Sequence, residues 1–192
     1  MEQVFGLFAS RPADIVNGNH LWGILTDTFL HGNWLHLIGN MYFLWVVGDN
    51  LESLLGHRRY LLIYLGLGIA ASLASIAAHP NSMIMSVGAS GAVAGLFGLY
   101  MVWFPYARLS FMIVIWQVKL PAWVYFIGWL GFNILDLNTG SQGVDYWAHI
   151  GGFIAGGILA LAMKSHIHTN YPWVAMLSGP NARFAKATEV AK

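Results

Sequence analysis

A serine and a histidine occur in two glycine-rich, apolar segments that lie far apart in the chain. Ser90 stands in GASGAVAG, and His149 stands in AHIGGFIAGG. A serine hydroxyl becomes an effective nucleophile when a base removes its proton, and histidine is the usual base. Each segment also has a simpler interpretation. Gly91 and Gly152 begin GxxxG patterns, which pack helices closely, and a buried histidine is often bonded to a backbone carbonyl.

A second pair of polar side chains, His36 and Asn40, could supply hydrogen-bond donors to the same chemistry. They lie four residues apart in HGNWLHLIGN and therefore share one helix face. With free backbone N–H groups at the start of the helix that carries Ser90, they could stabilise an oxyanion. The pair could instead join two helices. A metal site is a further alternative, although no carboxylate or additional histidine lies at ligand spacing on that face.

The composition predicts that these residues are positioned by a membrane protein. Hydrophobic residues make up 57% of the chain and charged residues 9%, whereas soluble domains carry about 25% charged residues. A helix needs about 20 mainly apolar residues to cross a bilayer. We therefore predict an all-α, polytopic transmembrane bundle with five spanning helices, at residues 34–55, 60–78, 83–104, 121–135 and 146–163. Residues 1–30 would form an outer N-terminal loop region, residues 31–165 the transmembrane core, and residues 166–192 a cytoplasmic polar tail.

The positive charges predict the orientation of the bundle, because cytoplasmic loops of membrane proteins are enriched in lysine and arginine. Eight of the nine such residues fall on the side of the C-terminal tail: Arg58, Arg59, Arg108, Lys119, Lys164, Arg183, Lys186 and Lys192. Only Arg11 falls on the other side. The N-terminus would then lie outside and the C-terminus in the cytoplasm, which fits a bacterial plasma membrane. Ser90, His149 and His36 would all lie at similar depths near the outer surface.

Composition also argues against other classes of protein. The chain has no cysteine, so a disulfide framework or a thiolate metal site is excluded. Its net charge is +1, and no basic cluster is large enough to follow a nucleic-acid backbone. We therefore expect no nucleic-acid partner.

Together, these segments resemble the rhomboid family of intramembrane serine proteases, over roughly residues 20–163. The resemblance lies in HGNWLHLIGN, in the DNLE region that ends at Glu52, in GASGAVAG and in AHIGGFIAGG, which occur in the family's order and helix spacing. It implies a rhomboid-like bundle in which Ser90 is the nucleophile and His149 is the general base, as a dyad without a required acid.

The resemblance also implies roles for the other polar and glycine residues of these motifs. His36 and Asn40 would line the oxyanion hole with the backbone N–H of Ser90, and Gly88 would lie beside them. Four further residues would be structural members of their motifs: His31, Glu52, Gly91 and Gly152. Glu52 would form hydrogen bonds near the inner side of the membrane.

The activity implied by the resemblance is cleavage of transmembrane segments of other membrane proteins near the outer side of the bilayer, with no metal or cofactor. Two alternatives belong to different classes. A catalytically inactive rhomboid-like protein would bind transmembrane clients without cutting them. A small transporter or channel subunit would also place polar residues on facing helices, but the chain has no internal repeat and no charged residue in the second or third predicted span.

The chain departs from the family pattern at several points. The family core has six helices and five are predicted here, as expected either of a fragment that lacks the first helix or of a chain whose start site is misassigned. Trp22 is followed by Gly23, where many members have arginine. Many members also place an aromatic ring against the catalytic histidine, four residues after the serine, but this position is Ala94. The imidazole must be held in another way, and Asp145, one turn before His149, is a candidate for orienting it.

Overall fold

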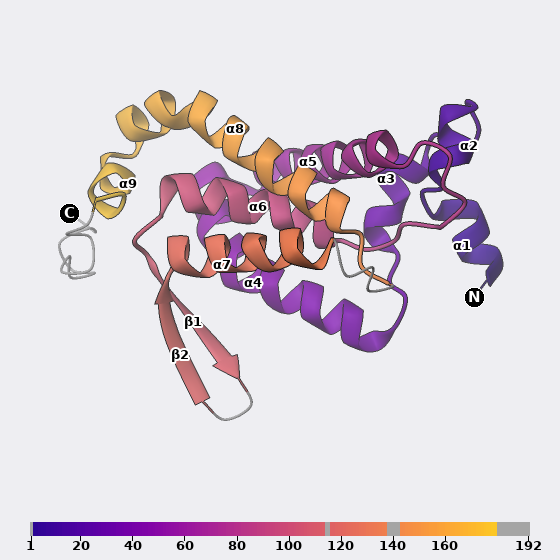
Figure 1. Ribbon diagram of the computed structural model, residues 1–192. Helices are drawn as coiled ribbons and strands as arrows, with labels where there is room; N and C mark the ends of the chain where they lie inside the picture. Colours follow the sequence, from indigo (N-terminus) through magenta and orange to yellow (C-terminus); the bar gives the residue numbers. More distant parts are fainter. Residues whose placement is uncertain (1, 114–115, 138–142, 180–192) are drawn as a thin grey trace.

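The computed structural model describes residues 2–113, 116–137 and 143–179. Five longer helices form the body of the molecule: α4 (Trp34–Leu55), α5 (His57–Ala78), α6 (Ser90–Trp103), α7 (Ala122–Asp136) and α8 (Tyr146–Asn170). Helix α6 lies in the middle of the bundle and packs against α8, α5, α4 and α7 (Figure 1). Residues 91–100 of α6 are all buried, and so is Trp103. The core of the protein is therefore built around the helix that begins with Ser90.

Length and apolar composition together distinguish α5 and α8 from the other helices of the bundle. In the part of the chain that the structure describes, these are the two helices long and apolar enough to cross a membrane by themselves. At 1.5 Å per residue, α6 and α7 are only about 21 and 22 Å long, and the hydrocarbon core is about 30 Å thick. Helix α4 has 22 residues, as many as α5, but is not apolar enough to meet the same criterion. The prediction of five spanning helices is thus supported for α5 and α8 and is not established for α4, α6 and α7.

The start of α6 differs from the prediction of a helix over residues 83–104. The helix begins at Ser90 and ends at Trp103, and an extended segment precedes it. Ser86 pairs with Ser10 in an isolated antiparallel bridge, with N···O distances of 3.2 and 2.7 Å. Gly88 has a φ of +128°, a conformation open to glycine but rarely to other residues. Pairing with the N-terminal region and this glycine together stop the helix from extending back to residue 83.

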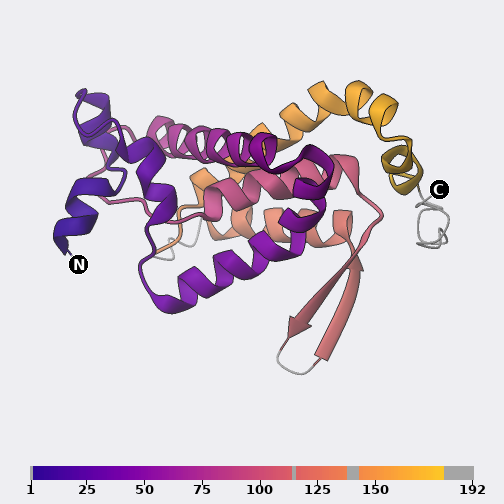
Figure 2. The ribbon, with the colours of Figure 1, turned by 180° about the vertical axis from the view of Figure 1, so that it is seen from behind.

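A β-hairpin between α6 and α7 corrects the all-α prediction. Strands β1 (Arg108–Ile113) and β2 (Trp116–Pro121) pair antiparallel, with Arg108 opposite Pro121. Figures 1 and 2 show the hairpin extending away from the helices. This segment was predicted to be only a connection between spans, but its valine, isoleucine, phenylalanine and tryptophan content favours strands. The fold is therefore mainly helical, with one two-stranded sheet among the described residues.

The N-terminal region, predicted as a loop, contains four short helical elements. These are α1 (Glu2–Phe8), α2 (Pro12–Val16), α3 (Gly23–Thr26) and the 3-10 helix η1 (Asp27–Phe29). They lie near one end of α5 (Figure 2). Hydrogen bonds hold the region together, from Trp22 Nε1 to the Leu7 carbonyl and from Thr26 Oγ1 to the Phe8 carbonyl, both at 2.7 Å. The segment that precedes α4 is therefore folded against the bundle.

The C-terminal boundary expected at residue 165 falls inside a helix. Helix α8 continues to Asn170, and α9 (Pro172–Leu177) follows it. Ile167 and Val174 are both buried. Ser178 Oγ donates to the Trp103 carbonyl at 2.7 Å, and Trp103 Nε1 donates to the Ala160 carbonyl at 3.0 Å. The part of the predicted tail that the structure describes thus packs against the end of α6.

Candidate active site

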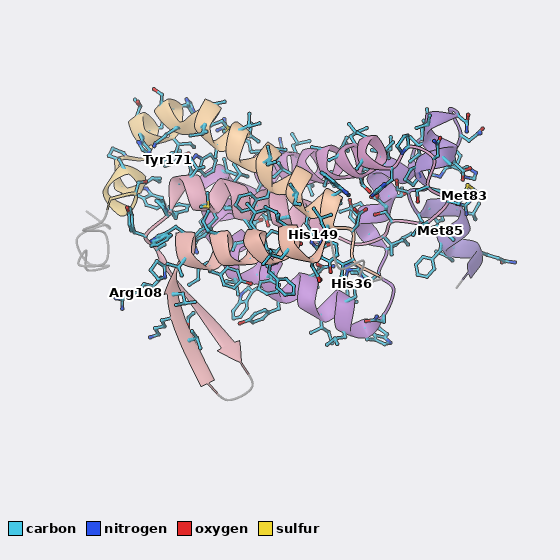
Figure 3. All side chains as sticks on the ribbon, viewed as in Figure 1. His36, Met83, Met85, Arg108, His149 and Tyr171 are labelled. Atoms are coloured by element: carbon cyan, nitrogen blue, oxygen red, sulfur yellow. The ribbon has the colours of Figure 1, made fainter. Side chains whose placement is uncertain are left out.

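A cavity of about 450 Å³ lies among η1, α4, α5, α6, α7 and α8. Seven residues selected from the sequence line it: His36, Asn40, Gly88, Ser90, Gly91, Asp145 and His149. Figure 3 shows His36 and His149 at the same level of the bundle, toward the end where the N-terminal helices lie. The fold thus brings three separate sequence motifs to one hollow.

Close packing of α6 against α8 places Ser90 and His149 at matching levels. A Cβ atom added to Gly152 would collide with the Gly91 carbonyl, and one added to Gly156 would collide with the Gly95 carbonyl. Gly91 directly follows Ser90, and Gly152 lies three residues after His149. This backbone contact therefore sets the register of the two helices beside the cavity. The two glycines predicted to be structural members of their motifs therefore lie at this contact.

The segment before Ser90 is shaped around His36. A Cβ atom added to Gly88 would lie 2.7 Å from His36 Cε1 and 2.8 Å from His36 Nε2. It would also lie 3.7 Å from Asn40 Nδ2. The backbone N–H of Gly88 donates to the Asp27 carbonyl at 2.9 Å, which fixes this turn to η1. Gly88 therefore allows the rings and amides of α4 to approach the start of α6 closely.

Asn40 carries an unused hydrogen-bond donor at the cavity. Its side chain is buried, and its Nδ2 has no hydrogen-bond partner among the described residues. Upstream, the Asn33 side chain caps α4 by accepting from the His36 N–H at 2.8 Å. A buried donor without a partner is uncommon in folded proteins. Such a group in a cavity beside a serine is free to bind an oxygen atom of another molecule.

The imidazole of His149 is held by α7. Its Nδ1 lies 2.7 Å from Asn133 Oδ1. The Trp129 ring lies 5.5 Å from the imidazole, centroid to centroid, at an interplanar angle of 36°. Tyr146 meets it edge-on at 6.3 Å. Asn133 was missed in the sequence, although a polar residue within an apolar helix is the signal that could have identified it.

Asp145 does not take the orienting role considered for it in the sequence. Its Oδ1 accepts from the Ala148 N–H at 3.0 Å, which caps α8. Its Oδ2 accepts from the hydroxyls of Ser75 and Ser86, at 2.6 and 2.7 Å. These contacts tie α8 to α5 and to the strand-like segment before α6. Asp145 therefore organises the rim of the cavity, while Asn133 is the hydrogen-bond partner of His149 Nδ1.

Asp27 is a second residue of the cavity that the sequence did not single out. It is buried, and the Ser72 hydroxyl donates to its Oδ2 at 2.7 Å. Burial raises the pKa of Asp27 to about 7, although hydrogen bonds from Ser72 and Thr28 act in the opposite direction. Nearby Asp145 raises this pKa further. The wall of the cavity next to Gly88 thus contains a carboxyl group that stays protonated to a higher pH than an unperturbed aspartate.

Two residues predicted from the motifs, His31 and Glu52, lie outside the cavity. The His31 ring contacts the His36 ring edge-on at 5.2 Å, and burial together with His36 lowers the pKa of His31. Glu52 lies at the opposite end of α4, where its Oε1 is 2.6 Å from His57 Nδ1. His31 is therefore adjacent to the site, and Glu52 joins the end of α4 to the start of α5.

Two further observations bear on the chemistry of the site. Among the described residues, the Ser90 hydroxyl makes no hydrogen bond to His149, although both side chains line the same cavity. Catalytic hydrogen bonds are often long before a substrate binds. The described residues also contain no group of three or more histidine, aspartate or glutamate side chains arranged to hold a metal ion.

The sequence of the chain matches a family of known proteins. The family model of the rhomboid domain matches residues 18–166. The chain is 35% identical over 170 residues to RHOMBOID-like protein 4 of Arabidopsis thaliana, covering 88% of this chain and 40% of that protein. It is 34% identical over 163 residues to the rhomboid protease GluP of Bacillus subtilis, covering 81% of this chain and 29% of that protein. The chain belongs to the rhomboid family of membrane proteins.

A further relative is shorter than these two. The putative rhomboid protease YdcA of Bacillus subtilis is 35% identical over 115 residues, covering 53% of this chain and 57% of that protein. The chain spans less than half the length of the Arabidopsis relative and of GluP. The matched region, residues 18–166, includes η1, α4, α5, α6, α7 and most of α8, and therefore every element that lines the cavity.

Proposed function

We propose that the chain is an intramembrane serine endopeptidase that cleaves transmembrane segments of other membrane proteins. The observation that carries this proposal is the convergence of Ser90, His149 and the unpartnered amide of Asn40 on one cavity within an apolar bundle. Membership of a family that includes a protein named as a protease supports it. Nucleophile, base and oxyanion donor are the three parts that acyl transfer requires.

In the proposed reaction, Ser90 Oγ attacks the carbonyl carbon of the scissile peptide bond while His149 Nε2 removes the hydroxyl proton. Negative charge develops on the carbonyl oxygen, and Asn40 Nδ2, His36 and the Ser90 backbone N–H stabilise it. The C–N bond then breaks, and the proton on His149 passes to the leaving amine. A water molecule, activated by His149, hydrolyses the acyl-enzyme and restores the Ser90 hydroxyl.

The polar wall of the cavity supports this hydrolysis within an apolar protein. Ser72, Ser86, Asp27 and Asp145 all line it, so water can be hydrogen bonded close to the Ser90 hydroxyl. With the orientation inferred from the positive charges, the cavity lies near the outer side of the membrane. Substrates would then be cut near that side, and the N-terminus would lie outside and the C-terminus in the cytoplasm.

The test is cleavage of a model transmembrane substrate by purified protein in liposomes. We expect the wild-type protein to cut the substrate and the Ser90→Ala and His149→Ala variants to lose this activity. Asn50→Leu is a matched control, because Asn50 lies on the same bundle but is exposed and outside the cavity. Cleavage that persists in Ser90→Ala would overturn the assignment.

One observation favours a second function, that of an inactive rhomboid-like protein which binds transmembrane clients. The Ser90 hydroxyl is not hydrogen bonded to His149 in the described structure, as would be expected if the pair never acted together. A folded wild-type protein that binds a transmembrane client and leaves it uncut would support this alternative.

A further inference from the structure

The orientation of the His149 ring is determined by a residue on a neighbouring helix. Asn133 of α7 is buried, with an exposed fraction of 3%. Its Oδ1 lies 2.7 Å from His149 Nδ1. Within the ranges that the structure describes, this is the hydrogen bond made by the His149 ring. Asn133 is therefore placed to decide which way the imidazole faces and which nitrogen carries the proton.

The second hydrogen bond of Asn133 fixes the direction of its amide. Nδ2 donates to the Trp129 carbonyl, four residues earlier, at 2.8 Å. A flipped amide would place Oδ1 against this carbonyl, so that two acceptors would face each other without a proton. The amide therefore presents an acceptor, Oδ1, to the imidazole. In the neutral ring, Nδ1 must then carry the hydrogen, and Nε2 has the free lone pair.

Other groups near the imidazole cannot replace this hydrogen bond. The carboxylate of Asp145 is occupied by Ser75, Ser86 and the Ala148 N–H. The Trp129 ring lies 5.5 Å from the imidazole, which limits its movement but does not select a tautomer. Position 94, one turn after Ser90 on α6, is an alanine and is fully buried. The ring is thus held from the α7 side.

We propose that Asn133 is a positioning residue that holds His149 in the Nδ1–H tautomer, with Nε2 available to accept the Ser90 proton. This inference rests on the proposed function, to which it adds a neutral third member. When His149 accepts the proton, Asn133 Oδ1 receives its hydrogen bond from a charged donor, which makes the bond stronger. The bond thus favours the protonated base in the transition state. An uncharged amide does this without burying a second charge beside the ring.

The direct test is nitrogen NMR of the imidazole in detergent-solubilised protein labelled with ¹⁵N-histidine. The His149 signals are identified by their loss in His149→Ala. In the wild type at a pH where the ring is neutral, we expect a protonated Nδ1 and an unprotonated Nε2. In Asn133→Leu, we expect a mixture of tautomers. A wild-type ring that is protonated on Nε2, or an unchanged His149 spectrum in Asn133→Leu, would overturn the proposal.

Kinetics supply a second readout. Misplacing a catalytic group costs about 10²-fold in rate, so Asn133→Leu should lower kcat by that order while KM stays close to the wild-type value. Asn133→Asp keeps an acceptor toward Nδ1 but sets a second oxygen against the Trp129 carbonyl, so it should recover only part of kcat. The control is Asn50→Leu, which removes a 3.3 Å hydrogen bond to Tyr100 far from the imidazole and should leave kcat unchanged. Equal kcat in Asn133→Leu and Asn50→Leu would contradict the proposal.

The two readouts separate failure of this inference from failure of the proposed function. If the protein is not a protease, the wild type shows no Ser90-dependent cleavage, but the tautomer of His149 is still measurable. If it is a protease and Asn133 has no positioning role, cleavage is normal in Asn133→Leu. Should Asn133→Leu fail to fold, the wild-type spectrum alone still distinguishes the Nδ1–H ring from the Nε2–H ring.

Discussion

The buried carboxyl group of Asp27 makes the stability of the protein depend on pH. Its pKa rises from 3.8 in an unperturbed side chain to about 7 in the folded protein. The folded state therefore binds this proton more tightly than the unfolded chain. The free energy of unfolding is greatest below pH 4 from this source, falls as the pH rises toward 7, and changes no further once the carboxyl group is ionised in both states.

The size of the effect follows from the same values. A difference of one pKa unit is worth 1.36 kcal/mol, so a rise from 3.8 to about 7 corresponds to at most about 4 kcal/mol. The substitution Asp27→Asn introduces an amide that resembles the protonated carboxyl group and cannot ionise. This amide still offers an oxygen to the Ser72 hydroxyl, which in the wild type donates to Asp27 at 2.7 Å. Asp27→Asn should thus be more stable than the wild type at pH 8 by up to this amount, and close to it at pH 4.

Thermal unfolding in detergent measures this difference. One kcal/mol shifts Tm by about 2–4 °C in a chain of this size, so the upper limit at pH 8 is roughly 8–16 °C in favour of Asp27→Asn. Subtracting the wild-type Tm at each pH removes the effects of pH that are common to both proteins. The same substitution at the exposed Asp49 is the control. An equal difference in Tm between Asp27→Asn and wild type at pH 4 and pH 8 would exclude this role of Asp27. The same pH-dependent difference in Asp49→Asn would also exclude it.

The site and its helix packing give two further predictions. Asn40→Ala should lower kcat by about 10²–10³-fold, as expected for loss of an oxyanion donor, with little change in Tm because Nδ2 has no partner in the described structure; a normal kcat in substrate cleavage would exclude this role. Gly152→Ala should lower stability by about 1–3 kcal/mol, because its Cβ would strike the Gly91 carbonyl. Gly157→Ala, whose Cβ meets nothing within 4 Å, should be neutral or slightly stabilising, and equal Tm values for the two alanine variants would refute the packing argument.

Much of the helical bundle could be predicted from the sequence because its apolar segments are long and bounded by polar residues. The segment predicted at residues 34–55 coincides with α4, and the segment at 121–135 lies within one residue of α7 at each end. The motifs around Ser90, His149 and His36 were also recognisable, since polar groups stand out among apolar neighbours. The prediction that these residues lie close together rested on the order of the helices and on their similar depths in the membrane.

The errors arise where tertiary contacts decide the local structure. Residues 83–89 are apolar enough for a helix, but pairing of Ser86 with Ser10 holds them extended. The hairpin at residues 108–121 has no turn signal strong enough to separate it from an apolar connection. Its two strands become evident only from their pairing with each other in the folded chain.

The residues missed at the site have a related explanation. Asp27 precedes the first motif and looks like a solvated loop aspartate, yet η1 folds it into the cavity wall against Ser72. Asn133 is a polar residue among apolar neighbours on α7, and its role depends on His149, which lies 16 positions later. Neither contact follows from residue type or spacing. Each requires the packing of helices that are separate in the sequence.

In the proposed function, Ser90 is a nucleophile that His149 activates. The most direct test is labelling of the detergent-purified protein with a fluorophosphonate, followed by mass spectrometry to locate the modified residue. We expect a covalent adduct on Ser90 in the wild type and no adduct in Ser90→Ala or His149→Ala, provided that a cooperative thermal transition shows these variants to be folded. An adduct that forms equally well in His149→Ala, or a folded wild-type protein that never reacts, would contradict it.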